Sequence, residues 1–416
     1  MLQGHKSRVN VVCCFHFGPV GGDALVSCST DKTARVWTQN GDAAAAAAGA
    51  AAGGEAAAWT NSATFTGHTG SVNCADVLVA GNQAFIATAS TDGTARVYRH
   101  VQDSADEAVA ANGGWRCVDT INFGSGIRPG QLPISVSLAM MPGTSVPVLA
   151  VGGDDAKIRV FCGVPSDDEP AAAGGGCKFQ LMTTLTGHED WVRSLTFARG
   201  DTGDDLLLAS ASQDQYVRVW RISPSKDGVL KPGQKLSFTE RALRQSRFLF
   251  TLPAGSNADG GGGGGGGDDA AAASYWEAKL EALLVGHDGW VYSVRWQPCK
   301  AGEPQPLALL SASMDRTMIV WSPDPASGVW IDSARVGEVG GTYIQGFFGG
   351  LWVRENAHRA ICAVRMQNVH SGPSLYVGCA PGHLVCWMLT RPQRGPLLPR
   401  WYLARFMLPC MLTRVC

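Results

Sequence analysis

The sequence predicts an all-β protein, a β-propeller of about six to seven blades, on the basis of three observations. First, an aspartate lies six residues before an aromatic residue five times along the chain. Second, in four of these units the surrounding string is nearly the same, and a Gly-His pair lies 30 to 34 residues before the aromatic residue. Third, each unit alternates apolar and polar residues as half-buried strands do, for example in VNVVCCF and LVSCS of the first unit.

Such a repeat is typical of WD40 units, each of which builds one four-stranded blade. In WD40 proteins the loop histidine, a serine, the aspartate and the following aromatic residue form a hydrogen-bonded chain across the blade. A buried imidazole needs partners for both ring nitrogens, which a carboxylate and a hydroxyl supply. The serine that we assign to this chain lies two positions before the aspartate. The four expected sets are His5, Ser29, Asp31 and Trp37; His68, Ser90, Asp92 and Tyr98; His188, Ser212, Asp214 and Trp220; and His287, Ser313, Asp315 and Trp321.

Serine, histidine and aspartate are also the residues of a nucleophilic triad, so a hydrolase is the alternative interpretation. A catalytic set occurs once per site, whereas this set occurs four times at nearly constant spacing. The repetition favours a structural role and predicts that the protein is not an enzyme. The sequence contains no C-x-x-C pair, zinc spacing, iron–sulfur spacing or phosphate-binding glycine motif, so we expect no metal and no cofactor.

The fifth unit, near 134–161, departs from the pattern. It keeps the string VPVLAVGGDDAKIRVF but lacks a Gly-His pair, and Gly153 replaces the serine. The hydrogen-bonded chain of the other units is therefore not expected here. We expect strand pairing and apolar packing to hold this blade together.

Size, charge and cysteine usage fit a single large domain inside the cell. The 416 residues carry a net charge of −1, which provides no overall field for nucleic acid or an anionic membrane. The first residues already enter a repeat, which leaves no room for a cleaved signal peptide, and no apolar run is long enough to span a membrane. We expect a cytoplasmic and nuclear protein whose cysteines are mostly buried free thiols.

The expected organisation is a propeller over residues 1–355 followed by a divergent tail over 356–416. The tail contains seven Arg and five Cys but no Asp, Glu or Lys. It is either a basic tail that binds RNA or anionic lipid, or a gene-model artefact, which the missing lysines favour; it could also supply a last irregular blade. Disordered inserts are expected, from their Ala- and Gly-rich or polar composition, at about 40–58, 102–114, 163–177 and 223–274.

Several strings are more specific than the generic repeat. These are GHDGWVYSVRWQP at 286–298, the long segment LLSASMDRTMIVWSPDPASGVWIDSARVGEVGG at 309–341, and GFFGG at 346–350. Together with the degenerate unit, they resemble the family of the second subunit of the Elongator complex, from about residue 2 to 352. Members of that family have two seven-bladed propellers, so the resemblance implies that this chain is an incomplete amino-terminal propeller.

The resemblance also implies a function. Elongator modifies wobble uridines in tRNA, and its chemistry belongs to a partner catalytic subunit. We therefore expect a non-catalytic scaffold whose partners are other Elongator subunits, with tRNA contacted only indirectly and no membrane. The alternatives are a generic WD40 adaptor, such as a substrate receptor of a ubiquitin ligase, and a direct tRNA-binding module.

Candidate partner contacts come from one repeated position. The residue three after each blade histidine opens the innermost strand, and Trp and Arg are enriched among the residues that dominate interface energies. Packing of these tryptophans on neighbouring loops is the alternative interpretation, as core packing is for the phenylalanines of GFFGG. The candidates are Arg8, Trp191, Trp290, Phe347 and Phe348.

Overall fold

The structure is a computed structural model that divides into two compact units, which are described separately. Unit 1 comprises Met1–Gly187, Asp204–Leu206 and Arg221–Lys279, and unit 2 comprises His188–Gly203, Leu207–Trp220 and Leu280–Cys416. The residues described are 4–20, 22–39, 59–102, 106–123, 131–166, 176–225, 247–251, 275–297, 304–337, 376–380, 383–390 and 402–407.

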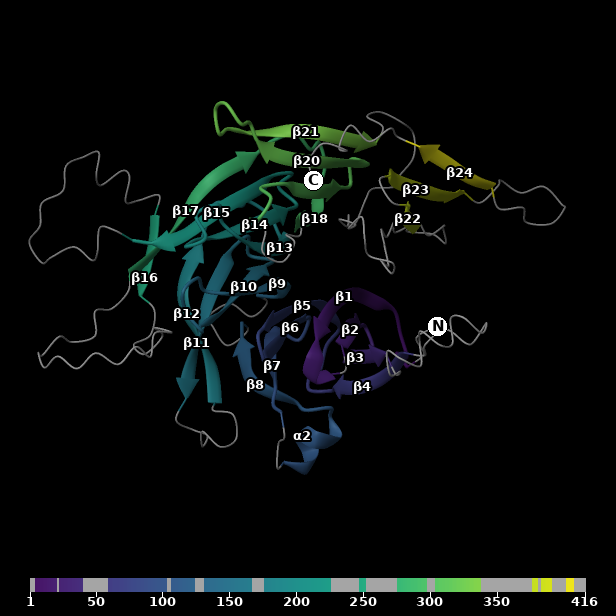
Figure 1. The fold of residues 1–416 in the computed structure, drawn as a ribbon, viewed down its shortest axis with the longest axis vertical. Helices are drawn as coiled ribbons and strands as arrows, with labels where there is room; N and C mark the ends of the chain where they lie inside the picture. Colours follow the sequence, from purple (N-terminus) through teal and green to yellow (C-terminus); the bar gives the residue numbers. More distant parts are fainter. Residues whose placement is uncertain are drawn as a thin grey trace, which may run out of the picture. The chain divides into compact units, whose positions relative to one another are not determined.

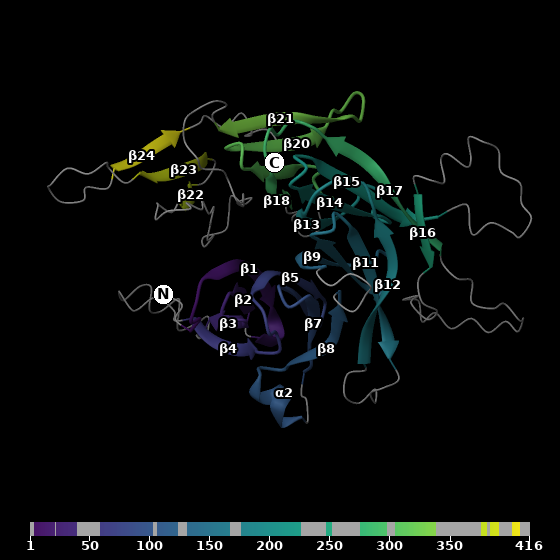
Figure 2. The same cartoon turned by 180° about the vertical axis from the view of Figure 1, so that it is seen from behind.

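Three four-stranded antiparallel sheets, which we call blades 1 to 3, follow one another along the chain in unit 1. Blades 1 and 2 lie side by side in both views of Figures 1 and 2, and the first strands of successive blades contact each other. The strands are β1 (Val9–Phe17), β2 (Gly22–Ser29), β3 (Ala34–Gln39) and β4 (Trp59–Phe65) in blade 1; β5 (Val72–Ala80), β6 (Gln83–Ser90), β7 (Thr94–His100) and β8 (Trp115–Asn122) in blade 2; and β9 (Pro133–Met140), β10 (Pro147–Gly153), β11 (Ile158–Ser166) and β12 (Gly176–Leu185) in blade 3.

Blade 4 is a five-stranded sheet in the order β13-β14-β15-β17-β16, and the boundary between the two units passes through it. Blade 5 has four strands and lies in unit 2, as does a three-stranded sheet near the carboxyl end. The strands are β13 (Val192–Arg199), β14 (Leu206–Ser212), β15 (Val217–Pro224), β16 (Arg247–Thr251) and β17 (Tyr275–Leu284); β18 (Val291–Trp296), β19 (Leu309–Ser313), β20 (Thr317–Pro323) and β21 (Trp330–Gly337); and β22 (Tyr376–Ala380), β23 (His383–Thr390) and β24 (Tyr402–Met407).

These sheets confirm the predicted all-β propeller class. The described residues form five blades and one three-stranded sheet, against the six to seven blades expected. The sheet β22-β23-β24 lies within the tail 356–416, for which the sequence left several interpretations open. The only other regular elements in the described ranges are a 3-10 turn, η1 (Gly18–Val20), and a short helix, α2 (Glu107–Ala111).

The turn after the second strand of each blade explains why an aspartate recurs there. The residue that follows the aspartate has a positive φ in all five blades, a conformation that costs most side chains energy. A glycine occupies this position in blade 2 only, so the other turns depend on backbone hydrogen bonds that their aspartate accepts. The five residues are Lys32 (φ 71°), Gly93 (80°), Ala156 (61°), Gln215 (75°) and Arg316 (69°).

Each unit has its own hydrophobic core, built from inward-facing strand residues of adjacent blades. In unit 1, Phe65 of blade 1 stacks on Tyr98 of blade 2 with ring centroids 3.9 Å apart, and Trp115 meets Phe65 edge-on. In unit 2, Leu207 and Val219 of blade 4 pack with Trp321 of blade 5. Burial of this apolar surface is the main force that joins neighbouring blades.

Two of the expected disordered inserts are ordered in part. The insert at 102–114 contains helix α2, whose amino end is capped by Asp106. Asn112 then ties the insert back to blade 1, because its side-chain oxygen accepts a hydrogen bond of 2.9 Å from the backbone of Thr64. In the insert at 163–177, strands β11 and β12 continue as a hairpin and pair as far as Ser166 and Gly176.

Part of the third insert is also a strand. Within 223–274, strand β16 pairs antiparallel with β17 and adds a fifth strand to blade 4. Composition missed these elements because strand pairing and local caps, rather than apolar content, order them. The insert at 40–58 lies outside the described residues.

Candidate functional site: hydrogen-bonded loops and an aromatic surface

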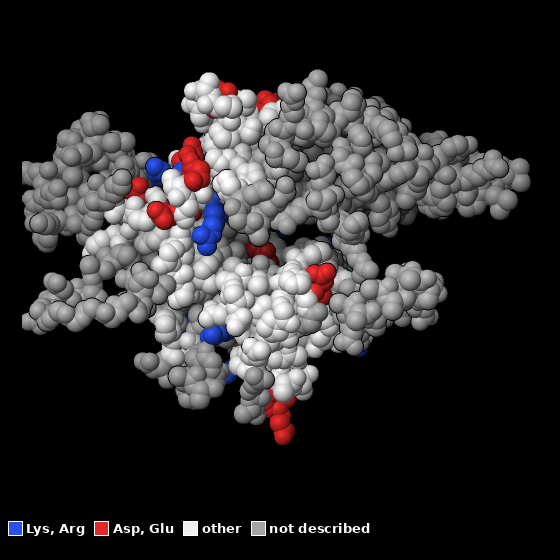
Figure 3. Space-filling view, viewed as in Figure 1, with Lys and Arg blue, Asp and Glu red and all other residues white. Residues whose placement is uncertain are grey.

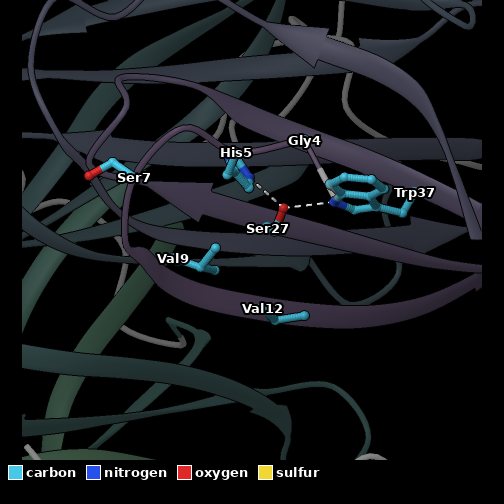
Figure 4. Close-up of a pocket in the computed structure, with 7 residues that line it drawn as sticks. All are labelled: Gly4, His5, Ser7, Val9, Val12, Ser27 and Trp37. Atoms are coloured by element: carbon cyan, nitrogen blue, oxygen red, sulfur yellow. Dashed lines mark hydrogen bonds between the residues drawn. The ribbon is translucent and has the colours of Figure 1, made fainter. Parts of the chain in front are cut away.

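In blade 1, a histidine, a serine, an aspartate and a tryptophan form one continuous hydrogen-bonded chain. His5 Nδ1 lies 2.8 Å from Asp31 Oδ2, and His5 Nε2 lies 2.7 Å from Ser27 Oγ. The indole nitrogen of Trp37 donates to the same hydroxyl at 2.7 Å. Figure 4 shows His5 and Trp37 both directed at Ser27.

The same chain occurs in the other three blades that begin with Gly-His. The histidine Nδ1 lies 2.7–2.9 Å from an aspartate Oδ2, and its Nε2 lies 2.7–2.8 Å from a hydroxyl. In blades 4 and 5 the tryptophan donates to this hydroxyl, at 3.1 and 2.8 Å. The hydroxyl residues are Thr88, Ser210 and Ser311.

The serine assignment from sequence was therefore wrong in all four blades that begin with Gly-His. The hydroxyl in the chain lies four positions before the aspartate, not two. Side chains two apart in a strand share a face, and the first of the two lies diagonally across from the tryptophan, since in blade 1 Leu25 is paired with Trp37 and Ser27 with Arg35. The residues that replace Ser29, Ser90, Ser212 and Ser313 in the chain are Ser27, Thr88, Ser210 and Ser311.

The predicted serines stabilise the turn instead. Ser29 Oγ accepts a hydrogen bond from the backbone nitrogen of Asp31 at 3.1 Å and donates to the carbonyl of Ser7. Ser212 and Ser313 make the same two kinds of contact in blades 4 and 5. A sequence signal for the correct residue existed, because a hydroxyl four positions before the aspartate recurs in all four units.

The indole N–H of Trp37 has only a hydrogen to give, so the oxygen of Ser27 accepts it. With the imidazole hydrogen on Nδ1, His5 donates to the carboxylate of Asp31, and the hydroxyl of Ser27 can donate to Nε2. Every polar atom of the chain is satisfied with the histidine uncharged.

A serine, histidine and aspartate in this order also occur in hydrolases, and a cavity of about 320 Å³ adjoins the set in blade 1. One lone pair of Ser27 Oγ is already engaged by the indole N–H of Trp37, which weakens the hydroxyl as a nucleophile. The cavity is lined by Gly4, His5, Ser7, Val9, Val12, Ser27 and Trp37 (Figure 4).

Blades 2 and 4 vary the chain. In blade 2, Tyr98 replaces the tryptophan and stacks on Phe65 in the core. In blade 4, Arg218 donates to Asp214 Oδ2 at 2.9 Å, whereas in blades 1, 2 and 5 a threonine hydroxyl donates to the aspartate Oδ1. That threonine, for example Thr317 in blade 5, donates to the aspartate at 2.7 Å.

Electrostatics favour the neutral-histidine, ionised-aspartate state. Burial lowers the pKa of His68 and His188, and the hydrogen bonds to their aspartates offset this only in part. Burial alone would raise the pKa of Asp214, but the hydrogen bond from His188 and two backbone N–H groups lower it to about 2. The pKa values of the corresponding aspartates in blades 1, 2 and 5 are held far below their usual range by the same balance.

Blade 3 contains a polar bridge that the sequence analysis did not foresee. Arg159 forms two hydrogen bonds to the carboxylate of Asp155, at 3.2 and 2.6 Å, and a third to the side-chain oxygen of Gln131 at 3.1 Å. The expected strand pairing and apolar packing are present in this blade, and the polar bridge adds to them. A side chain at Gly153 would meet Asp155 Oδ1 at 2.6 Å, so the glycine makes room for the bridge.

The aspartate of each chain also fixes the loop that follows the histidine. In blades 4 and 5 its Oδ2 accepts from the backbone nitrogens of Glu189 and Asp288, at 3.2 and 3.0 Å. The next but one residue in each loop is a tryptophan. The hydrogen-bonded chain thus holds Trp191 and Trp290 at equivalent positions in adjacent blades.

Both tryptophans are exposed. Trp191 is 39% and Trp290 is 41% accessible to solvent. The guanidinium of Arg193 lies over the rings of Trp191 and Tyr292, at 4.8 and 5.6 Å from their centroids. Tyr292 meets Trp290 edge-on at 6.3 Å, and its hydroxyl contacts the sulfur of Met314 at 3.8 Å. We call Trp191, Arg193, Trp290, Tyr292 and Met314 the aromatic surface.

Sequence reasoning found the two tryptophans but missed the three residues that connect them. Arg193 and Tyr292 each lie two positions after a tryptophan, on the same face of the strand, and this alternation was the available signal. Arg8, the equivalent candidate in unit 1, is exposed and donates to the side chain of Asn10 at 3.2 Å. Phe347 and Phe348 lie outside the described residues.

In the part of the chain that the structure describes, no helix is both long enough and apolar enough to cross a membrane. The same residues contain no group of three or more side chains arranged to hold a metal ion.

Comparison with known proteins agrees with the repeats seen here. The family of the WD domain, G-beta repeat, matches residues 1–38, 59–99, 179–221 and 278–322. A protein of Danio rerio named Elongator complex protein 2 is 33% identical over 354 residues, which is 84% of this chain and 35% of the relative. The proteins of the same name from Dictyostelium discoideum and Homo sapiens are 31% and 37% identical, over 84% and 56% of this chain and 38% and 24% of their own lengths.

Strands β9 to β11 of the degenerate blade 3 lie outside the matched repeats, in line with the different polar bridge of this blade. The chain spans about a third of the length of the curated relatives that it matches. The repeats, the strand topology and the relatives agree: the chain belongs to the WD40-repeat family and is related in sequence to Elongator complex protein 2.

Proposed function

We propose that the chain acts as a non-catalytic scaffold subunit of an Elongator-type assembly. In this role it holds catalytic and scaffold subunits through protein–protein contacts and supports the modification of tRNA wobble uridines only indirectly, in the cytoplasm and nucleus. The names of the relatives support membership in such an assembly.

One observation carries the proposal. Two tryptophans are exposed on loops whose backbone is hydrogen-bonded to the aspartates of the blades. Large aromatic side chains on a rigid backbone lose little conformational entropy when a partner covers them, which is why they dominate interface energies. Leaving them exposed without a partner is unfavourable, because their apolar surface then stays in contact with water.

The experiment is a double substitution, Trp191→Ala with Trp290→Ala, in the full chain. We expect capture of the other Elongator subunits from cell extract to fall at least tenfold, while circular dichroism and melting temperature stay unchanged. The matched control is Arg8→Ala, at the equivalent position in unit 1. Undiminished capture by the tryptophan variant would refute the proposal.

A second candidate function, direct tRNA contact, is favoured by the loops of blade 1. Lys6, Arg8 and Lys32 are exposed there. Phosphate contacts of this kind give binding that falls steeply with salt. On the face drawn in Figure 3, however, charged side chains of the described residues form small separate groups of both signs rather than a continuous basic stripe. Salt-titrated tRNA binding by a Lys6→Ala, Lys32→Ala variant tests this candidate: a lower affinity with a shallower salt slope supports it.

A further inference from the structure

The loops around the aromatic surface carry an excess of negative charge. We count the six residues that begin with each loop histidine and the five that begin with each aspartate. In blades 4 and 5 together, these residues include five carboxylates and three arginines. Two of these carboxylates, Asp214 and Asp315, are hydrogen-bonded to the histidines of their blades, and Asp214 is also paired with Arg218. The loops around the exposed aromatic rings therefore carry two more carboxylates than arginines.

Two exposed carboxylates lie on the same loops as the tryptophans. Glu189 lies two residues before Trp191, and Asp288 lies two residues before Trp290. The backbone nitrogen of each acid is bound to the aspartate of its blade, which holds the loop backbone that carries the acid and its tryptophan. The same order of acid and tryptophan therefore occurs on two loops held in the same way.

The molecule itself shows which group such rings accept. Arg193 places its guanidinium over both Trp191 and Tyr292, the geometry of a cation–π contact. Over Trp290, the described residues place no cation; the ring meets only the edge of Tyr292. A ring with a nearby carboxylate attracts a positively charged side chain by both the ring quadrupole and Coulomb's law.

We propose that the aromatic surface, with Glu189 and Asp288, binds an arginine- or lysine-rich segment of a protein partner. This inference rests on the proposed scaffold function and names the chemistry of the partner. A basic side chain of the segment stacks on Trp290 and pairs with Asp288, and a second one pairs with Glu189 beside Trp191. An acidic segment is disfavoured, because it would meet Glu189 and Asp288 with like charge.

The test measures binding of fluorescently labelled hexa-arginine to the full chain by anisotropy at low ionic strength. We expect affinity to fall at least tenfold in the double variant Glu189→Gln, Asp288→Asn, which keeps shape and both tryptophans. The same fall is expected for Trp191→Ala, Trp290→Ala. Labelled hexa-glutamate should bind at least tenfold more weakly than hexa-arginine.

The matched control removes two exposed carboxylates elsewhere, Glu107→Gln on α2 and Asp332→Asn on β21, and should leave hexa-arginine affinity within twofold of the parent. Equal losses in the control and in the Glu189, Asp288 variant would show non-specific attraction and overturn the inference. Failure of hexa-arginine to bind, or tighter binding of hexa-glutamate, would also overturn it.

The outcomes separate this inference from the scaffold function. If the tryptophan variant no longer captures the other Elongator subunits but the Glu189, Asp288 variant still does, the surface is a docking site whose partner is not basic. If both variants still capture them, the proposed function is refuted, regardless of how hexa-arginine binds.

Discussion

The loops of blades 1 and 2 and those of blades 4 and 5 are built on the same hydrogen-bonded chain but present opposite chemistry. Counted in the same way as above, the loops of blades 1 and 2 carry two carboxylates and five basic residues. Where blades 4 and 5 place Trp191 and Trp290, blades 1 and 2 place Arg8 and Ser71.

The residue two positions further along the chain shows the same contrast. In unit 1, Asn10 donates to Ser71 at 3.2 Å and to the carbonyl of Val72 at 2.8 Å, so these residues are used to join two blades. In unit 2, the equivalent positions hold Arg193 and Tyr292, which contribute to the aromatic surface. The chain of His, hydroxyl and Asp fixes the backbone, and the residues that follow are free to differ.

The largest effect is expected from removing an aspartate of the chain. Asp315→Ala takes away the acceptor of His287, of Asp288 N and of both donors of Thr317. We expect a loss of about 3 kcal/mol or more in the free energy of unfolding, because buried donors are left unsatisfied. Calorimetry measures the loss as a lower melting temperature.

Asp92→Ala is the matched substitution in unit 1. Its effect on stability should be similar, since Asp92 accepts an equivalent set of bonds. Hexa-arginine binding should be lost in the Asp315 variant and kept in the Asp92 variant. Equal loss of binding in both would mean that the loops of the two units do not act separately.

A swap of surface residues between the units is expected to act on binding alone. Trp191→Arg with Trp290→Ser gives unit 2 the residues that Arg8 and Ser71 provide in unit 1. We expect at least a tenfold loss of hexa-arginine affinity, because the aromatic faces disappear and a positive charge is added. The melting temperature should stay within the experimental error, and a large drop would contradict the view that these positions are free to vary.

Acid should lower the stability of the folded protein in two stages. The folded-state pKa values of His68 and His188 lie below the ordinary value of 6.5, so the unfolded chain binds these protons more readily. Stability is therefore complete above about pH 6.5 and declines as the pH falls below it. A second decline follows below about pH 4, towards the pKa of about 2 of Asp214.

Melting temperature as a function of pH checks both stages. His16→Gln is the matched control, because His16 and Asp23 form an exposed pair with 75% and 67% of their side chains accessible. We expect the control to keep the decline between pH 7 and 5, and His188→Asn to reduce it. A flat profile over that range in the parent protein would contradict the assignment of neutral buried histidines.

The smallest effect is expected at the threonine of the chain. Thr317→Val removes a hydroxyl that donates to Asp315 at 2.7 Å and should cost about 1 kcal/mol. Tyr216 occupies the same place in blade 4, where Arg218 reaches the aspartate instead. Tyr216→Phe should therefore change the free energy of unfolding by less than about 0.5 kcal/mol, and equal effects would argue against this replacement.

Much of the fold could be predicted because the repeat is local and periodic. Alternating strands, the aspartate of each turn and the Gly-His start identify the four regular blades, since each signal depends on residues close in sequence. Blade 3 showed the limit of this reasoning. Without the Gly-His pair, the sequence offered no means of finding the bridge from Arg159 to Gln131, 28 residues away.

The candidate site was predictable only in part, for the same reason. The position of Trp191 and Trp290 follows from their distance to the loop histidine, but their contact with Arg193 and Tyr292 joins two blades about a hundred residues apart. The inserts were misjudged because Asn112 and β16 are ordered by partners on other strands.

By itself, the sequence determined the repeating unit, the four histidine–aspartate pairs and the tryptophans that follow them. Only the tertiary structure decided that Ser27, and not Ser29, lies between His5 and Trp37, and that five side chains from two blades form one aromatic surface. The physical reason is that hydrogen bonds and ring contacts depend on distances of a few ångströms, which strand register and blade packing set and local periodicity does not.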